Sequence, residues 1–354
     1  MGDEHRHHSH HHHHHGHDRT GGGKLAFTKG RLIAILAFWV VLLGGLWLGG
    51  KLLDGSEPET KGSLEGRFRS ETQVEYNGTT YGYRDHYLTT TLVLGVDNES
   101  LSNSKSGGYR SGGQADFLML LVADREKRTV TPIQIDRDTI TIIRIYGVFG
   151  NISSYRNTQL CLAQAFGNTV AMNCENTSWA VSNLLLGIPI DHFVAIDMAS
   201  INRLNDALGG ITVTIDEDLT SISPEMVPGA TVTLHGEQAE QFVRSRRTVS
   251  DGTNISRMGR QRAFMTGLET VLRQRLASDS DTIGQLYDLL GSDLATDMSR
   301  GTLVNEAYTM SQYEMGEIRT LDGTGKVGDD GYKEFHVDSE RLNELIISTC
   351  FEAY

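Results

Sequence analysis

A stretch of nineteen uncharged residues, from Leu32 to Gly50, constrains this chain more than any other feature. As a helix it is long enough to cross a hydrocarbon core of about 30 Å. Lysine and arginine residues precede the stretch, and acidic residues follow it. The positive-inside rule therefore predicts a cytoplasmic tail over residues 1–31, a transmembrane helix over 32–53 and an extracellular remainder. A cleaved signal peptide is the alternative, but the stretch is long and no small-residue cleavage site stands at its end.

The tail contains ten histidines between His5 and His17. Such a tract could bind a transition metal, although it offers no fixed geometry. A native low-complexity tail and an expression tag are both consistent with this composition. The tract does not contribute to the predicted fold.

The exported part is predicted to be a polar lead-in or stalk over residues 54–84 and one domain over 85–354. Apolar runs predict strands at residues 91–97, 117–123, 130–135, 192–196 and 211–215, with short ones near 318 and 335. Helical periodicity is found at residues 158–166, 179–186, 198–208, 257–276, 303–310 and from 339 onwards. Strands that alternate with helices favour an α/β domain with helices packed on a central sheet.

Six arginines lie within nineteen residues, in a chain of formal net charge −13. They are Arg244, Arg246, Arg247, Arg257, Arg260 and Arg262. Clustered guanidinium groups need an anion between them, and a pyrophosphate accepts bidentate hydrogen bonds from them. Nucleic acid fits less well, because it favours a broad basic face. Arg244 and Arg246 point the same way if that stretch is extended. A solvated helix face with Arg–Glu pairs remains an alternative.

Two acidic residues stand at predicted strand ends. Asp97 ends the first strand, and Asp116 opens the second. If the strands are neighbours, both carboxylates could reach one magnesium ion, which takes one or two protein carboxylates beside phosphate and water oxygens. Asp97 alone could equally be a turn acid. Arg137 follows the third strand between two acids, where an ordinary salt bridge is equally consistent with the sequence.

Three cysteines in an exported region permit one disulfide. Cys161 and Cys174 are the expected pair, and three buried free thiols are the alternative. The chain contains no P-loop, no Gly-x-Ser-x-Gly elbow and no His-Glu-x-x-His motif. Nucleotide hydrolysis, serine hydrolysis and zinc proteolysis are therefore unsupported. Arginines and aspartates in this arrangement suit phosphoryl transfer from a pyrophosphate.

Ordered sequence blocks resemble the LytR-CpsA-Psr family over about residues 88–350. The blocks are Leu94-Gly95-Val96-Asp97, Ala115-Asp116-Phe117-Leu118, Ile135-Asp136-Arg137-Asp138-Thr139, Leu186-Gly187-Ile188-Pro189-Ile190-Asp191, Asp206-Ala207-Leu208-Gly209-Gly210, Leu234-His235-Gly236-Glu237-Gln238-Ala239, Phe242-Val243-Arg244-Ser245-Arg246 and Arg257-Met258-Gly259-Arg260-Gln261. The resemblance implies a central mixed β-sheet flanked by helices. It also implies a membrane-anchored enzyme of Gram-positive bacteria that moves a glycopolymer from a polyprenyl-pyrophosphate carrier onto peptidoglycan.

The resemblance also implies roles for particular residues. Asp97 and Asp116 would hold magnesium. The pyrophosphate would be bound by Arg137, Arg244, Arg246 and Arg257, with Arg260 as a further member. Asp116, Arg137, Arg244 and Arg246 would be catalytic. The prenyl chain would lie in an apolar tunnel between the sheet and the helices.

The chain departs from the family pattern in three places. Asn98 and Glu99 stand where an arginine is common, and Arg110 could substitute for it. Gln114 replaces the arginine of an Arg-Ser-Asp-Thr block, and Asp136 replaces a proline. A polyprenyl-pyrophosphate phosphatase and a non-catalytic cell-surface or regulatory protein are therefore alternative functions.

Overall fold

The computed structural model describes residues 72–97, 101, 112–245 and 253–354. The predicted tail, the transmembrane helix over residues 32–53 and the first part of the lead-in lie outside these residues. Within the described ranges, no helix is both long enough and apolar enough to cross a membrane.

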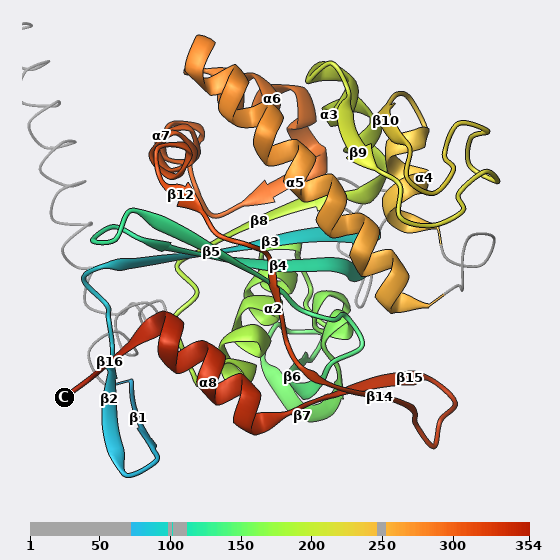
Figure 1. Cartoon of the computed structure of the whole chain (residues 1–354). Coiled ribbons are helices and arrows are strands. Elements are labelled where there is room, and N and C mark those ends of the chain that lie inside the picture. The colour runs from blue at the N-terminus through green and yellow to red at the C-terminus, as the bar shows by residue number, and fades with distance from the viewer. Residues whose placement is uncertain (1–71, 98–100, 102–111, 246–252) are drawn as a thin grey trace, which may run out of the picture. The chain divides into compact units, whose positions relative to one another are not determined.

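A mixed sheet forms the centre of the described residues, with strand order β11–β8–β3–β4–β5–β12 and with β13 also pairing with β5 (Figure 1). β3 runs parallel to β8 and antiparallel to β4, and β4 runs antiparallel to β5. The strands are β3 (Leu88–Asp97), β4 (Gln114–Asp124), β5 (Thr129–Gln134), β8 (His192–Asp197), β11 (Leu294–Thr296), β12 (Glu314–Met315) and β13 (Arg319–Thr320). The prediction of an α/β domain with a central mixed sheet is confirmed.

Alternating side chains along β3 and β4 send apolar residues to both faces of the sheet. Leu92, Leu94, Leu118 and Leu120 belong to one core, which also contains residues of α2 (Val170–Leu184) and α8 (Ser339–Cys350). Because successive strand residues point to opposite faces, Phe117 lies on the other face, against the remaining helices. Both faces are covered, which explains why these strands appear in the sequence as continuous apolar runs.

The second face carries the long helix α5 and a smaller hairpin (Figure 1). Its elements are α3 (Ile201–Ala207), β9 (Ile211–Thr214), β10 (Thr231–Leu234), α4 (Gln238–Arg244), α5 (Asn254–Ser278), α6 (Thr282–Leu290) and α7 (Arg300–Ser311). A second core, which includes Leu204, Ile211, Phe242 and Phe264, joins α3, α4, α5 and the hairpin. The predicted helices at residues 198–208, 257–276 and 303–310 are confirmed with small shifts at their ends.

Two hairpins differ from the predicted elements. The β1 (Gln73–Tyr76) and β2 (Thr79–Tyr83) strands pair with each other and with β16 (Phe351–Ala353). Residues 73–83, in the segment predicted to be a stalk or lead-in, therefore form two strands. Residues 158–166, predicted to be helical, form the end of β7 (Ile152–Gln159) and the short 3-10 helix η3 (Leu160–Ala165). β7 pairs with β6 (Ile140–Tyr146), and neither of these strands was predicted from the sequence.

A further hairpin consists of β14 (Gly323–Val327) and β15 (Lys333–Val337). It contacts the segment that follows β5. The Phe335 amide donates to the carbonyl of Asp138 (2.8 Å), and Thr139 forms a bridge with Phe335. Segments far apart in the sequence therefore meet beside Arg137.

Candidate functional site

The candidate site lies where β3 ends, β4 begins and the chain leaves β5. Pairing between β3 and β4 joins Gly95 to Phe117 and Val96 to Ala115, so Asp116 is the extra residue of a bulge. A bulge re-aims a side chain relative to regular alternation, and bulges are frequent next to active sites. At the bulge, the Asp116 side chain therefore departs from the regular alternation of β4 side chains between the two faces of the sheet.

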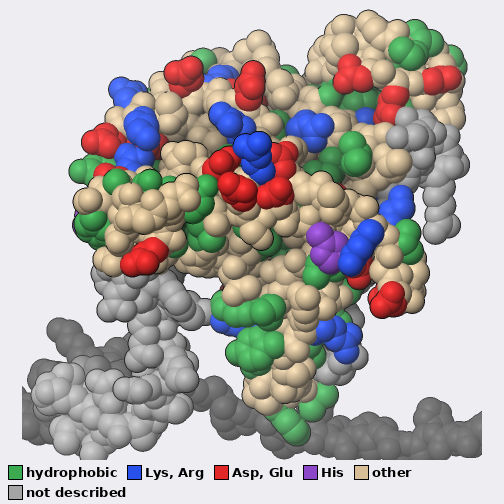
Figure 2. Space-filling model, turned by 60° about the horizontal axis from the view of Figure 1, so that its bottom comes forward, with side chains coloured by type: hydrophobic (Ala, Val, Ile, Leu, Met, Phe, Trp, Pro, Cys, Tyr) green, Lys and Arg blue, Asp and Glu red, His purple; other side chains and the backbone are tan. Residues whose placement is uncertain are grey.

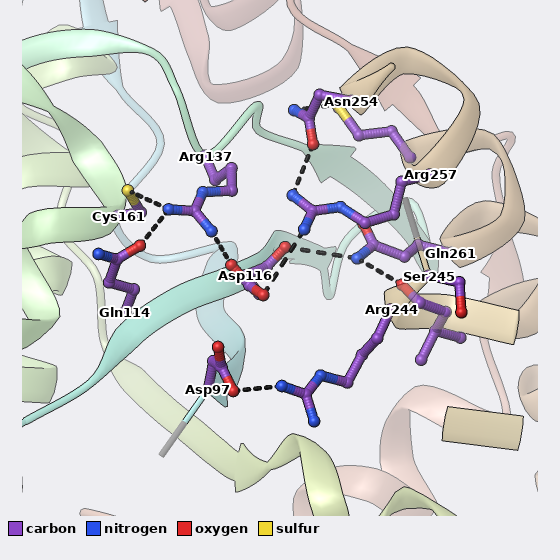
Figure 3. A network of polar contacts seen from close by, with 12 residues as sticks. Asp97, Gln114, Asp116, Arg137, Cys161, Arg244, Ser245, Asn254, Arg257 and Gln261 are labelled. Atoms are coloured by element: carbon purple, nitrogen blue, oxygen red, sulfur yellow. Dashed lines mark hydrogen bonds and ion pairs between the residues drawn. The ribbon is translucent and has the colours of Figure 1, made fainter. Parts of the chain in front are cut away.

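Two arginines converge on the Asp116 carboxylate, which is 7% exposed (Figure 3). Arg137 Nη1 forms an ion pair with Oδ1, and Arg257 Nη1 lies 3.5 Å from Oδ2. Arg137 comes from the segment after β5, and Arg257 from the first turns of α5. Two guanidinium groups thus share one carboxylate in a region nearly closed to water. The structure brings together these three predicted residues.

Arg137 has further partners that the sequence did not identify. Its Nη2 donates to Gln114 Oε1 and lies 3.0 Å from the Cys161 sulfur. Its Nε lies 3.4 Å from Asp138 Oδ1 and is buried without a hydrogen bond. Gln114, noted as a loss of positive charge relative to the family pattern, here supplies an acceptor that holds Arg137.

The predicted disulfide between Cys161 and Cys174 is wrong, because all three cysteines are free and buried. Cys161 lies on η3 with its sulfur against Arg137, whereas the Cys174 sulfur accepts from Gln164 Nε2 (3.5 Å). Each thiol therefore has its own polar partner. Burial raises the pKa of the Cys161 thiol, and it raises that of Cys174 to about 12, so both remain protonated at neutral pH.

Arg257 is 1% exposed and is positioned by a chain of polar contacts. Its Nη2 donates to Asn254 Oδ1, and Asn254 Nδ2 donates to Asp136 Oδ1 (2.7 Å). The Asp138 backbone amide also donates to Asp136 Oδ1 (2.8 Å). Burial is the largest influence on the Asp136 carboxyl and raises its pKa, while the two donors and Arg257 act in the opposite direction. Asp136 therefore takes part in the hydrogen-bonded chain that positions Arg257.

Arg244 is the last residue of α4, so the condition of an extended stretch is not met at this residue. Its guanidinium pairs with Asp97 (Figure 3) and also with Glu240. Asp97 is the last residue of β3 and is half exposed. Asp97 and Asp116 therefore lie near the same end of the two adjacent strands β3 and β4. Arg246 lies outside the described residues.

Arg260 is not one of the groups around Asp116. Its Nε donates to the Phe242 carbonyl (2.7 Å), and its other nitrogens contact Glu217 and the Ser245 carbonyl. Since Phe242 belongs to α4, Arg260 joins α4 to α5. Arg262, two residues further along α5, donates to Gln134 Oε1 (2.9 Å).

An apolar cavity of about 90 Å³ lies between the sheet and α5. Its lining includes Val93, Gly95 and Phe117 from the sheet and Phe264, Met265 and Leu268 from α5. A Cβ atom at Gly95 would lie 2.4 Å from the Met198 sulfur, so only glycine fits there without displacing Met198. Gln261 also lines the cavity, and its Nε2 lies 3.3 Å from the carbonyl oxygens of both Asp116 and Val243. The cavity therefore begins directly behind Asp116.

A second, polar hollow of about 440 Å³ borders Arg244. It is lined by Asn202, Glu237, Glu240, Gln241, Arg244 and Ser245. The site thus combines a cationic centre, an apolar cavity behind it and a polar hollow at its side. Among the described residues, no group of three or more His, Cys, Asp or Glu side chains is placed to hold a metal ion.

The chain belongs to the LytR_cpsA_psr family, whose model matches residues 58–348. This confirms the resemblance inferred from the sequence. One relative is the polyisoprenyl-teichoic acid–peptidoglycan teichoic acid transferase TagU of Halalkalibacterium halodurans, 29% identical over 58% of this chain and 60% of the relative. Another is the cell wall biosynthesis protein LcpA of Corynebacterium glutamicum, 26% identical over 68% of this chain and 52% of the relative. The matches thus span a little over half the length of these two relatives.

The fold is also found in solved structures. A structure of TagT bound to LI-WTA superposes with a TM-score of 0.57 at 20% identity, over 81% of this chain and 97% of that one. This likeness establishes the shared fold.

Proposed function

We propose that the protein transfers a glycopolymer from a polyprenyl-pyrophosphate carrier to a sugar hydroxyl of peptidoglycan. In this reaction a P–O bond forms between the acceptor oxygen and the phosphorus that carries the polymer. The P–O bond to polyprenyl phosphate breaks, and the acceptor hydroxyl loses its proton. The observation that supports this function best is the pair of buried arginines, Arg137 and Arg257, on Asp116, whose carbonyl accepts from the cavity-lining Gln261.

The two arginines suit a pyrophosphate because their donors are fixed in advance. Arg257 is held by Asn254, and Arg137 by Gln114 and Cys161. Preorganised guanidinium groups in a site with little water stabilise charge that develops on bridging and non-bridging oxygens. A pyrophosphate that displaces Asp116 from the arginines would receive bidentate hydrogen bonds from both.

The apolar cavity supports a lipid carrier. Its volume of about 90 Å³ is below the roughly 300–1,000 Å³ of ordinary ligand sites. A prenyl chain would therefore have to separate α5 from the sheet, and Phe264, Met265 and Leu268 would line the enlarged space. The unbranched, flexible side chain of Met265 adapts to such a change more readily than a branched one.

The polar hollow beside Arg244 supports a saccharide. Its amide, carboxylate and hydroxyl side chains provide the hydrogen-bond donors and acceptors that sugar hydroxyls need. Because Arg244 borders both the hollow and Asp97, a sugar in the hollow would lie next to the phosphate site.

Magnesium belongs to the proposal as an ion held by Asp97 and Asp116. Two carboxylates on adjacent strands form an oxygen donor set of the kind that magnesium prefers. Both carboxylates are paired with arginines here, and a pyrophosphate that attracts these arginines would leave carboxylate oxygens available. When bound, the ion would supply positive charge to the phosphate oxygens.

The proposed location follows from the sequence. The uncharged stretch over residues 32–53 would anchor the chain as a single pass, with the N-terminus in the cytoplasm and the catalytic domain outside. Protease added to intact cells whose envelope admits it should then remove the domain after residue 54.

A product assay with lipid-linked polymer and peptidoglycan fragments tests the proposed function. Transfer should yield polymer attached to peptidoglycan together with polyprenyl phosphate. Free phosphorylated polymer instead would identify a phosphatase, and no product with a bound lipid would indicate a non-catalytic relative. Arg137→Lys, which keeps the charge but loses the forked geometry, should greatly slow transfer. Arg341→Gln is the matched control, because Arg341 is an exposed α8 residue paired with Glu344.

A further inference from the structure

The tip of the β6–β7 hairpin exposes hydrophobic side chains to solvent. Phe149 is 94% exposed and Val148 is 63% exposed, and Ile142, Ile152 and Tyr155 on the two strands are exposed as well. Five of the thirteen large hydrophobic side chains exposed in the described part of the chain thus lie in this one hairpin. Figure 2 shows hydrophobic side chains gathered on a projecting part of the surface, with Lys or Arg side chains beside them. Contiguous exposed apolar surface usually marks an interaction site.

The exposure is a property of an ordered loop. The Gly147 amide donates to the Asn151 carbonyl (2.8 Å), and the Gly150 amide donates to the Gly147 carbonyl (2.9 Å). Asn168 Nδ2 also donates to the Gly147 carbonyl (2.8 Å), which ties the loop to the segment before α2. Gly150 has a φ of +78°, which glycine adopts without strain. The loop therefore holds Val148 and Phe149 outward.

The charge of this region differs from that of the rest of the chain. Residues 140–174 contain Arg144 and Arg156 but no Asp, Glu or Lys, whereas the whole chain contains 45 acidic residues. A region without acids in an acidic chain is complementary to a negatively charged surface.

The residue types are also ordered along the hairpin. Val148 and Phe149 form the tip, and Arg144 pairs across the strands with Tyr155 further from it. The Tyr155 ring lies 5.8 Å from the Trp179 ring, and Arg144 Cζ lies 4.1 Å from the Trp179 ring centroid. An apolar end followed by Tyr, Trp and Arg is the order found across a membrane–water interface, where aromatic rings and long cationic side chains lie at headgroup level.

We propose that the β6–β7 hairpin inserts its tip into the surface of a bilayer that contains anionic lipids. Val148 and Phe149 lie among the upper acyl chains, and Arg144, Arg156 and Tyr155 lie at the headgroups. This contact is separate from the predicted anchor and does not depend on the proposed reaction. The hairpin begins just after Arg137 and returns at Gln159, whose Nε2 donates to Asp138 Oδ1 (3.2 Å). The seven-residue strand β6 therefore separates Arg137 from the inserted tip by about 20 Å.

The test uses the full chain reconstituted into phosphatidylcholine vesicles with and without phosphatidylglycerol. A polarity-sensitive fluorophore is attached to Phe149→Cys, and it labels this position selectively because the three native cysteines are buried. The matched control is Val327→Cys on the β14–β15 hairpin, where the native side chain is similarly exposed. Lipids with a quencher on the acyl chain report depth.

The expected result is a blue shift and quenching at position 149 only, stronger with phosphatidylglycerol. Arg144→Gln and Arg156→Gln should each weaken insertion into the anionic vesicles by about fivefold. Equal emission at positions 149 and 327 would overturn the proposal. So would a blue shift without vesicles that grows with protein concentration, because a second copy would then cover the tip. Equal quenching in both lipid mixtures would overturn the role given to the arginines.

Discussion

Strand β4 has a buried aspartate at each end, and the two ends are built differently. At its last residue, Asp124 pairs with Arg84 (2.6 Å), and Arg84 also meets Glu126 (2.7 Å) and Glu352 (3.9 Å). One guanidinium there is surrounded by three carboxylates. At the other end, Asp116 is one carboxylate shared by Arg137 and Arg257. The first arrangement gathers carboxylates around one cation, whereas the second gathers two cations on one carboxylate, with Asp138 as a further carboxylate 3.4 Å from Arg137 Nε.

This difference contrasts an ion pair that joins parts of the fold with the site proposed to bind pyrophosphate. Arg84 joins the strand to the C-terminal segment, because Glu352 belongs to β16 and the Arg84 amide also donates to the Cys350 carbonyl (3.0 Å). Arg257 joins α5 to Asp116 on β4, and Arg137 joins the segment after β5 to Asp116 and Gln114 on the same strand. Burial alone does not distinguish Arg84 from Arg137 and Arg257, whereas the number of guanidinium groups that share one carboxylate does.

The largest expected effect is on stability at the Arg84 end. Arg84→Gln leaves the Asp124 carboxylate buried without its cation and should lower the unfolding free energy by roughly 3–5 kcal/mol. Urea denaturation of the full chain measures this change. Arg341→Gln, at an exposed pair, should cost roughly 0–1 kcal/mol. Equal costs for the two variants would show that the Arg84 pair is not structural.

The next effect is on catalysis at the Asp116 end. Arg257→Gln removes a preorganised donor and should slow glycopolymer transfer by roughly 10²–10³-fold. Its unfolding free energy should change less than that of Arg84→Gln, because Asp116 keeps Arg137 as a partner. Transfer per folded molecule should be unchanged in Arg84→Gln. The comparison breaks down if both variants lose transfer to the same degree.

A smaller effect concerns metal binding. Asp97→Asn should weaken magnesium binding measured by calorimetry in the presence of pyrophosphate, and a chelator should abolish transfer by the unmodified chain. The loss of its exposed pair with Arg244 should change the unfolding free energy by only about 0–1 kcal/mol. Asp293→Asn, at another partly exposed pair with an arginine, is the control. Unchanged magnesium binding in Asp97→Asn would show that Asp97 is not a magnesium ligand.

The smallest effect is a difference in pH dependence. Burial raises the pKa of Asp136 near the site, so its proton is bound more tightly in the folded than in the unfolded chain. Its contribution to stability is present below the unfolded pKa of about 3.9 and is lost as pH rises through the folded pKa. Asp136→Asn should therefore be more stable than the parent at neutral pH, and melting curves should converge as pH falls below that value.

Asp124 should behave in the opposite way. Burial favours its neutral form, but the hydrogen bonds from Arg84 and the Lys127 amide outweigh burial and lower its pKa. Its contribution is therefore present above the unfolded pKa and lost as pH falls through the folded pKa. If Asp124→Asn and Asp136→Asn show the same sign of pH dependence, the contrast between the two ends is wrong.

The sequence predicted the central strands because β3, β4, β5 and β8 are apolar on both faces. It missed β7, in which Ile152 to Asn157 are exposed and polar residues predominate. It also predicted a helix over residues 158–166, where apolar residues spaced by three and four fill the core from a 3-10 turn instead. Apolar periodicity in the sequence indicates that residues are buried, but it does not distinguish an α-helix from a 3-10 turn.

For the site, the resemblance identified Asp116, Arg137 and Arg257, and the structure brings these three together. It did not identify Asn254, Gln261 or Cys161 as their partners. Such residues are common polar types, and their contacts join positions up to 145 residues apart, as between Gln261 and Asp116. The geometry of these contacts depends on how α5 packs on the sheet, which no local pattern encodes.

The amide of Gln261 spans the carbonyls of Asp116 on β4 and Val243 on α4, and Arg257 lies one turn earlier on the same helix. If the proposed lipid tail separates α5 from β4, these contacts would stretch and Arg257 would shift. The binding of the tail and of the phosphate would then be thermodynamically linked. By reciprocity, each must change the affinity of the other by the same factor. Carriers with shorter tails should therefore bind with a different affinity for the phosphate itself, which titration with a series of prenyl pyrophosphates would measure.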